Sequence, residues 1–396
     1  MKRTQYIKMA AFICISFIFI CYSYAGDPKA KPFLPDISKE WTKITPGPTN
    51  VMGSLVVPTC SNYPGTDPTF SFFVRGGSVN NLVVYFQGGG ACWNSLTCLL
   101  YPANTIYTVD VTDSDNPINY KGMFDLSNPK NPFKDWSFVF IPYCTGDVHL
   151  GSKDATYYYP PPSNQPWTIH HRGFDNFLVV LDWITKNFRK PHDIFVAGSS
   201  AGSYGALGLF PWIKEAYPES KVYVLGDAGM GVTPPQFDRR AIWNIQYPEW
   251  IFGNNPPNIP TAEAYKIVAE YYPHIKLAQF TDAWDGTQTL FYNLIVHSVG
   301  ASHGPNVCVD WHDKMIASVD YEQEAPNYRS YIAAGTAHTI LASLAFYTEN
   351  SAGISFLDWL DTMVSNQGGT NGHGGVPWEN MECTECGEPT SCPYTP

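Results

Sequence analysis

The stretch IFVAGSSAGSYGALGLF, residues 194–210, decides how this chain folds. Its first part is a short apolar run that ends at a glycine, which is the pattern of a buried strand. From residue 201 onward the apolar residues recur along one side of a predicted helix. Ser200 therefore lies at a strand-to-helix turn, between Gly198 and Gly202. A G-x-S-x-G sequence at such a turn is typical of a serine nucleophile, although a glycine-rich chain contains the pattern by chance in roughly a tenth to a fifth of cases.

The rest of the chain alternates between strand and helix patterns. Short apolar runs predict buried strands at 82–87, 137–143, 193–198, 221–226, 275–281 and 328–335. Helical patterns lie between them at 176–188, 206–217 and 261–272. This alternation predicts an α/β fold with a mostly parallel central sheet and helices on both faces. The segment 229–274, rich in Trp, Tyr and Pro, is predicted to be a cap or lid insertion beside the functional site.

Residues 1–25 have the features of a secretory signal peptide. Lys2, Arg3 and Lys8 precede an apolar run at 9–22, and small residues follow at the predicted cleavage point after Ala25. The run is too short and wrongly flanked for a good transmembrane helix, and no later segment has the length of a membrane span. We therefore expect an exported, soluble protein in which 26–396 form a single domain.

The charge balance excludes some partners. Loss of three basic residues with the signal peptide changes the formal net charge from -11 to -14. Such an acidic chain is a poor partner for nucleic acid or an anionic membrane surface.

Cysteine usage points to an oxidising compartment. Two of the ten cysteines leave with the signal peptide, and an even number remains, which predicts up to four disulfides. Three of them lie in a Cys-rich tail, residues 366–396, near His373. A zinc site there is disfavoured because the tail contains one C-x-x-C pair and lacks the second pair that a typical zinc site has. We expect no metal and no organic cofactor.

An activated serine needs a histidine that accepts its proton and an acid that orients the histidine. In one known chain order both follow the serine, each on a loop after a strand. His338 follows the last predicted strand directly, and the loop after the strand at 275–281 carries Asp282 and Asp285. Order alone does not choose between these two acids. The less well placed histidines are His170, His171, His297, His303 and His373.

Stabilisation of a developing oxyanion needs backbone N–H groups. Ala201, directly after the serine, offers one of them, and the loop QGGGACWN at 87–94 offers others. Its three glycines let the backbone approach a carbonyl oxygen closely. Nucleophile, base, acid and glycine loop occur in the expected order, which favours a serine hydrolase.

Taken together, these stretches resemble the pectin acetylesterase family, which also contains the animal Notum carboxylesterase. The similar segments are GGGACWN, IPYCTGD (141–147), GSSAGSYG, LGDAG (225–229), WDGTQ (284–288) and YIAAGTAH (331–338). The resemblance implies an α/β-hydrolase fold with Ser200 as nucleophile and His338 as general base. It selects Asp285 as the acid through its D-x-x-Q spacing. The implied oxyanion donors are the N–H groups of Gly90, Ala91 and Ala201.

The sequence departs from the family pattern in two places. Ala91 stands where plant and animal members have a tryptophan directly after the glycines, and Trp93 lies two positions later. Trp93 is therefore a candidate substrate-binding residue, and the accepted acyl group stays open. The segment CTGDVHLG carries Asp147 and His149 where plant members differ. These two residues either line the pocket or hold a loop.

The resemblance also implies disulfides and an activity. The implied pairs are Cys92–Cys98 and Cys60–Cys144, with Cys308 bound to one of Cys383, Cys386 and Cys392 and the other two bound to each other. The implied protein is a secreted serine carboxylesterase, expected to be a monomer, that removes O-acetyl groups from a polysaccharide such as pectin. The alternatives are a Notum-like esterase for longer acyl (lipid) esters and a non-catalytic carbohydrate-binding homologue.

Overall fold

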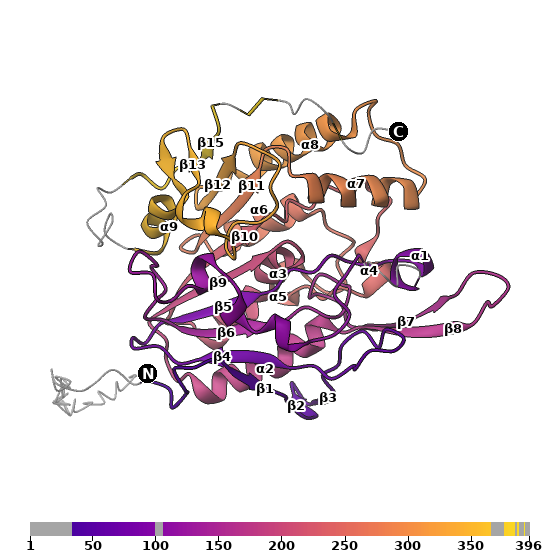
Figure 1. Cartoon of the computed structure of the whole chain (residues 1–396), viewed down its shortest axis with the longest axis horizontal. Helices are drawn as coiled ribbons and strands as arrows, with labels where there is room; N and C mark the ends of the chain where they lie inside the picture. Colours follow the sequence, from indigo (N-terminus) through magenta and orange to yellow (C-terminus); the bar gives the residue numbers. More distant parts are fainter. Residues whose placement is uncertain (1–33, 100–105, 366–375, 385, 388–391, 393–396) are drawn as a thin grey trace, which may run out of the picture. The chain divides into compact units, whose positions relative to one another are not determined.

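A nine-stranded sheet organises the computed structural model (Figure 1), in the order β1-β4-β6-β5-β9-β10-β11-β12-β15. From β6 to β15 the neighbouring strands are parallel, whereas β4 pairs antiparallel with β6 and β1 antiparallel with β4. The strands are β1 (Thr42–Ile44), β4 (Phe72–Arg75), β5 (Leu82–Phe86), β6 (Ser137–Ile141), β9 (Asp193–Ser199), β10 (Lys221–Asp227), β11 (Lys276–Asp282), β12 (Tyr328–Ala333) and β15 (Met381–Glu382).

The structure describes residues 34–99, 106–365, 376–384, 386–387 and 392. The predicted signal peptide, residues 1–25, lies outside this range, as does most of the predicted Cys-rich tail at 366–396. Residues Phe33–Pro396 belong to one compact unit. None of the helices in the described ranges is long and apolar enough to cross a membrane.

Helices connect the parallel strands. The longer ones are α2 (Gly173–Asn187), α3 (Ala201–Ala216), α6 (Thr261–Tyr271), α7 (Gly286–Ser298), α8 (Val307–Glu322) and α9 (Phe356–Val364). Shorter ones are α1 (Ser95–Leu99), α4 (Arg239–Trp243) and α5 (Glu249–Phe252). Three small hairpins lie outside the main sheet: β2 (Thr49–Val51) with β3 (Ser54–Val56), β7 (Lys153–Tyr158) with β8 (Pro166–His171), and β13 (Asn350–Ser351) with β14 (Ile354–Ser355).

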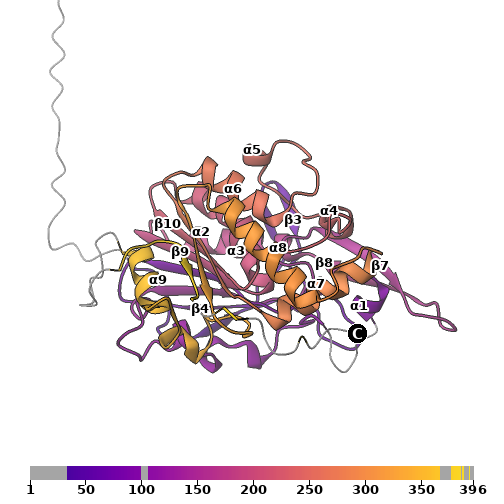
Figure 2. The same ribbon diagram turned by 90° about the horizontal axis from the view of Figure 1, so that it is seen from above.

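Both faces of the sheet are covered by other parts of the chain. Alternate residues of each strand point to opposite faces, so each strand contributes to two apolar cores. On β5, Val84 and Phe86 belong to one apolar core with residues of α2, α3 and α6. Val83 and Tyr85 belong to the other, with α9 and the 3-10 turns around Phe124. Figure 2 shows α3, α6 and α8 together on one side of the sheet. The predicted α/β class, with helices on both faces, is confirmed.

The predicted strands and helices all occur, but three of the longer helices, α7, α8 and α9, were not predicted. Helix α6 is the crossover between β10 and β11, and its Tyr265 packs edge-on against Tyr328 of β12. Within the segment predicted as a cap, 229–274, the residues that line the site pocket all lie before α6, in 229–260. In α7 the apolar residues lie on two sides, since Phe291 lines the pocket while Val296 is buried in the core, so no single apolar face marks it.

Candidate active site

Ser200 occupies a strained turn between β9 and α3. Its φ of 55° and ψ of -122° lie outside the regions that non-glycine residues favour. The turn is tight enough to require the glycines on either side. A Cβ at Gly198 would meet the carbonyl oxygen of Gly202, and a Cβ at Gly202 would meet that of Phe86. The Ser200 N–H donates to the Asp227 carbonyl oxygen over 2.7 Å, which ties the turn to the next strand.

The other predicted site residues follow neighbouring parallel strands. Gly90 comes after β5, Asp285 after β11 and His338 after β12. Because the carboxyl ends of parallel strands meet at one edge of a sheet, these residues reach the same edge as Ser200. Helices α1, α4 and α7 all lie toward the right of both views (Figures 1 and 2).

His338 and Asp285 are in direct contact. The imidazole Nδ1 donates to Asp285 Oδ2 over 2.7 Å, and the carboxylate is fully buried. His338 Nε2 is buried without a hydrogen-bond partner among the described residues, and His338 lines the same pocket as Ser200. Burial favours the neutral imidazole, but the hydrogen bond and charge of Asp285 outweigh it and raise the pKa of His338 above its ordinary value. Nε2 is thus free to accept a proton at the pocket wall.

The D-x-x-Q spacing has a local physical reason. Asp285 is the N-cap of α7, and its Oδ1 accepts the Gln288 N–H over 2.9 Å. The Gln288 side chain donates to Asp285 Oδ2 over 3.0 Å, so both carboxylate oxygens are fixed. Gln288 Oε1 in turn accepts the Met230 N–H.

Asp282 has a different environment. Its carboxylate accepts the N–H of Ala337 over 2.8 Å, and no hydrogen bond to His338 is formed among the described residues. Burial raises the pKa of Asp282 to about 7. The geometry therefore separates the two acids between which chain order could not choose, since Asp285 contacts His338 and Asp282 supports the loop before it.

The conformation of the glycine loop contradicts the prediction that the Ala91 N–H is an oxyanion donor. The Ala91 N–H donates to the Ile106 carbonyl oxygen over 3.2 Å, as part of an antiparallel bridge between Gly90 and Tyr107. Ala91 is therefore not available as a donor. The N–H groups of Gly90 and Ala201 have no acceptor among the described residues, and both residues line the pocket. Ala201 also begins the helix α3, whose N-terminal dipole favours negative charge.

The pocket between these groups holds about 690 Å³ of empty space, part of it open to solvent. Trp93, the displaced loop tryptophan, lies in its wall. The Trp93 Nε1 donates to Ser298 Oγ over 2.9 Å, and the ring packs edge-on against Phe237 with centroids 5.7 Å apart. The other large apolar lining residues are Val148, Tyr204, Val232, Trp243, Phe291, Tyr292, Ile295 and Trp311.

Asp147 and His149 hold a loop instead of lining the pocket, which settles the alternative left open by the sequence. Asp147 is fully buried and accepts from Thr145 Oγ1 and from the N–H of Gly173, over 2.6 and 2.7 Å. His149 Nε2 donates to the Gln87 carbonyl oxygen over 2.8 Å. Burial raises the pKa of Asp147 to about 7 and lowers that of His149 to about 4. Only Val148, between them, reaches the pocket.

Asp227 is a supporting residue that the sequence analysis did not single out. Its buried carboxylate accepts from the Ser199 hydroxyl over 2.5 Å and from the N–H groups of Ile340 and Leu341 over 3.0 Å each. Burial raises the pKa of Asp227 to about 6. Asp227 thus joins the residue before the nucleophile to the loop that carries His338. Its position at the end of a strand, within LGDAG, was the available signal.

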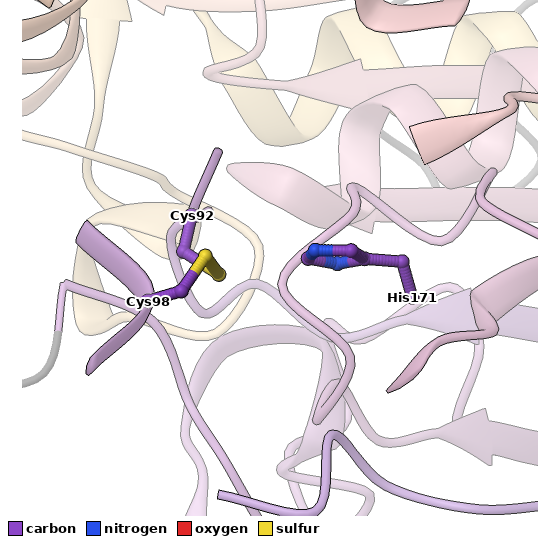
Figure 3. A group of neighbouring side chains, drawn as sticks. All are labelled: Cys92, Cys98 and His171. Atoms are coloured by element: carbon purple, nitrogen blue, oxygen red, sulfur yellow. A yellow bond between two sulfur atoms is a disulfide. The ribbon is translucent and has the colours of Figure 1, made fainter. Parts of the chain in front are cut away.

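The Cys92–Cys98 disulfide closes the segment after the glycine loop. Figure 3 shows the disulfide facing His171. The two cysteine sulfurs and a ring nitrogen of His171, the kinds of atom that bind metals, lie within 4.8 Å of one another. The imidazole is already committed, because Nδ1 donates to the Thr145 carbonyl oxygen and Nε2 accepts from the Tyr157 hydroxyl, each over 2.9 Å. With both sulfurs bonded and both ring nitrogens partnered, this cluster is not arranged to hold a metal.

Three further disulfides are present. Cys60 is bonded to Cys144, which joins the segment before β4 to the end of β6. In the C-terminal part the pairs are Cys308–Cys392 and Cys383–Cys386.

Comparison with known proteins adds an independent observation. The sequence profile described as Pectinacetylesterase matches residues 58–264, just over half of the 396 residues. Pectin acetylesterase 11 of Arabidopsis thaliana is 25% identical over 46% of this chain and 45% of its own length. Palmitoleoyl-protein carboxylesterase NOTUM of Schmidtea mediterranea is 26% identical over 32% of this chain and 23% of its own. The chain thus spans less than half the length of these relatives.

Proposed function

This chain belongs to the pectinacetylesterase family, a family of carboxylic ester hydrolases, and on that premise we propose that it is a secreted serine esterase that removes O-acetyl groups from a polysaccharide such as pectin. The observation that carries the proposal is the 2.7 Å contact between His338 and Asp285 beside a pocket that Ser200 also lines. The four disulfides support an oxidising compartment.

In the proposed reaction Ser200 Oγ attacks the ester carbonyl carbon while His338 Nε2 accepts the hydroxyl proton. Asp285 stabilises the imidazolium and keeps Nδ1 protonated. The N–H groups of Gly90 and Ala201 donate to the oxyanion of the tetrahedral intermediate. The leaving alcohol takes the proton from Nε2, and water then releases acetate from the acyl-enzyme by the same steps in reverse order.

Replacement of Ser200 by Ala tests the assignment. The substitution removes one hydroxyl group from a half-buried residue, so the fold stays intact while hydrolysis of 4-nitrophenyl acetate falls by several orders of magnitude. A fluorophosphonate probe should label the wild-type protein at Ser200 and not the variant. A folded variant with near-normal turnover, or a wild-type protein that the probe does not label, contradicts the proposal and favours a non-catalytic carbohydrate-binding role.

The pocket supports a second candidate. Its apolar, aromatic walls suit an acyl chain longer than acetyl, as in the palmitoleoyl esters named for the NOTUM relative. Hydrolysis of 4-nitrophenyl esters from acetate to octanoate separates the two candidates. Falling kcat/KM along this series supports the deacetylase, whereas rising kcat/KM supports the longer acyl substrate.

A further inference from the structure

Arg239 forms part of the wall between the site pocket and a second cavity. The second cavity has about 450 Å³ of empty space, and its lining is mostly apolar, with Leu150, Leu207 and Phe252 among the residues. Two residues, Tyr204 and Arg239, line both spaces. Tyr204 lies one helical turn after Ser200 on α3, so the wall with Arg239 stands directly beyond the nucleophile.

Arg239 is buried and forms no ion pair within the part of the chain that the structure describes. The residue is only 7% exposed. Nη1 donates to Thr261 Oγ1 over 3.0 Å and Nη2 donates to the Ile259 carbonyl oxygen. Nε has no hydrogen-bond partner among the described residues. Two of the five N–H groups of the side chain are therefore used, and both acceptors are neutral.

A buried charged group is normally ion-paired, or all of its N–H groups are hydrogen-bonded. The reason is that removing the charge from water costs more free energy than hydrogen bonds to neutral acceptors supply. The neighbouring Arg240 differs in this respect. It is partly exposed, donates to Asn255 Oδ1 and the Pro256 carbonyl oxygen, and lines neither cavity. Of these two arginines, only Arg239 lines the site pocket, and its guanidinium is incompletely bonded among the described residues.

We propose that Arg239 is a specificity-determining residue that binds a carboxylate of the ester substrate. This inference rests on the proposed esterase function. A carboxylate matches the planar guanidinium fork and supplies the missing negative charge. The carboxylate belongs either to the alcohol part, as in an O-acetylated uronic acid, or to the acyl part, as in the half-ester of a dicarboxylic acid. Both substrates present the same group to Arg239.

Matched ester pairs test the proposal. The first pair is O-acetylated oligogalacturonate and its neutral methyl ester, and the second is the 4-nitrophenyl half-ester of succinate and its neutral methyl ester. For the wild-type enzyme we expect kcat/KM to favour the carboxylate in one pair, which identifies the part of the substrate that carries it. In Arg239→Met this preference should fall on the order of 10- to 100-fold, mainly through KM. The readout is the ratio of kcat/KM within a pair, because a general loss of activity in Arg239→Met lowers both members of the pair alike.

Two controls complete the design. Arg240→Met removes the neighbouring cation and should keep the preference, whereas Arg239→Lys should retain part of it. If Arg239→Met does not fold, competitive inhibition of the wild-type enzyme and of Arg239→Lys by galacturonate and succinate, against their amides, measures the same selectivity. Equal kcat/KM within both ester pairs, equal inhibition by acids and amides, or an unchanged preference in Arg239→Met overturns the proposal.

The failure of the proposed function would look different. A wild-type protein that hydrolyses no ester contradicts the esterase assignment, and calorimetric binding of galacturonate and succinate to the wild-type protein and Arg239→Met then still tests the carboxylate site. Weaker binding to Arg239→Met supports the site, and equal or undetectable binding to both proteins overturns it.

Discussion

Replacement of Asp285 by Asn is the most informative perturbation of the site. The carboxylate lies 2.7 Å from His338 Nδ1 and is fully buried, so the substitution leaves the imidazolium that forms during the reaction without its counter-charge. Removing one partner of a buried charged pair typically costs about 3–5 kcal/mol. At 1.36 kcal/mol for each factor of ten, kcat should fall about 10²- to 10⁴-fold.

The pH dependence gives a second readout. Asp285 contributes most of what holds the pKa of His338 above its ordinary value, against the effect of burial. Without that charge the imidazole is protonated only at lower pH. The acid limb of kcat/KM for the residual activity should therefore move to lower pH in Asp285→Asn, as measured with 4-nitrophenyl acetate from pH 4 to 9.

Asp282→Asn is the matched control, because Asp282 is also buried and lies three residues earlier. Its oxygen accepts only the Ala337 N–H among the hydrogen bonds of the described residues, and asparagine keeps such an acceptor. We expect less than about a tenfold loss of kcat, since the substitution weakens only one hydrogen bond to a backbone N–H. If Asp282→Asn lost as much activity as Asp285→Asn, or if the latter kept wild-type kcat, the reasoning from the His338 contact would be refuted.

Three further predictions concern disulfides, pH and metals. Loss of Cys92–Cys98, with a sequence separation of 6, should cost about 2 kcal/mol of stability but reduce kcat/KM more than loss of Cys60–Cys144, with a separation of 84. Equal kcat/KM of the two double Ser variants would contradict a role in holding the glycine loop. Burial raises the pKa of Glu322 from 4.5 to about 8, so the folded state retains a proton that the unfolded state loses and stability falls as pH rises between these values. The unfolding free energy of Glu322→Gln, measured in urea, should therefore rise by up to a few kcal/mol relative to that of the wild type between pH 5 and pH 8. A difference in unfolding free energy that does not change with pH would contradict this expectation. Dialysis against EDTA should leave 4-nitrophenyl acetate turnover within about 2-fold, because every proposed step uses side chains and backbone N–H groups; a loss restored by zinc would argue otherwise.

Local sequence determined those features whose physical cause lies within a few residues. The alternation of strand and helix patterns is such a feature, as is the turn at Ser200, where the close approaches of the backbone require Gly198 and Gly202. The D-x-x-Q spacing is another, because an N-cap aspartate and the third residue of its helix always lie within reach of each other.

Tertiary structure decided those features whose partners come from distant segments. Ala91 lost its predicted role because its N–H meets Ile106, a neighbour that no local pattern reveals. Asp147 is buried and bonded to the distant Gly173 instead of lining the pocket, and Arg239 lies in a cavity wall through the packing of α4. Whether an N–H is free, a carboxylate is buried or a cation is paired depends on the surrounding solvent and acceptors, and these exist only once the chain has folded.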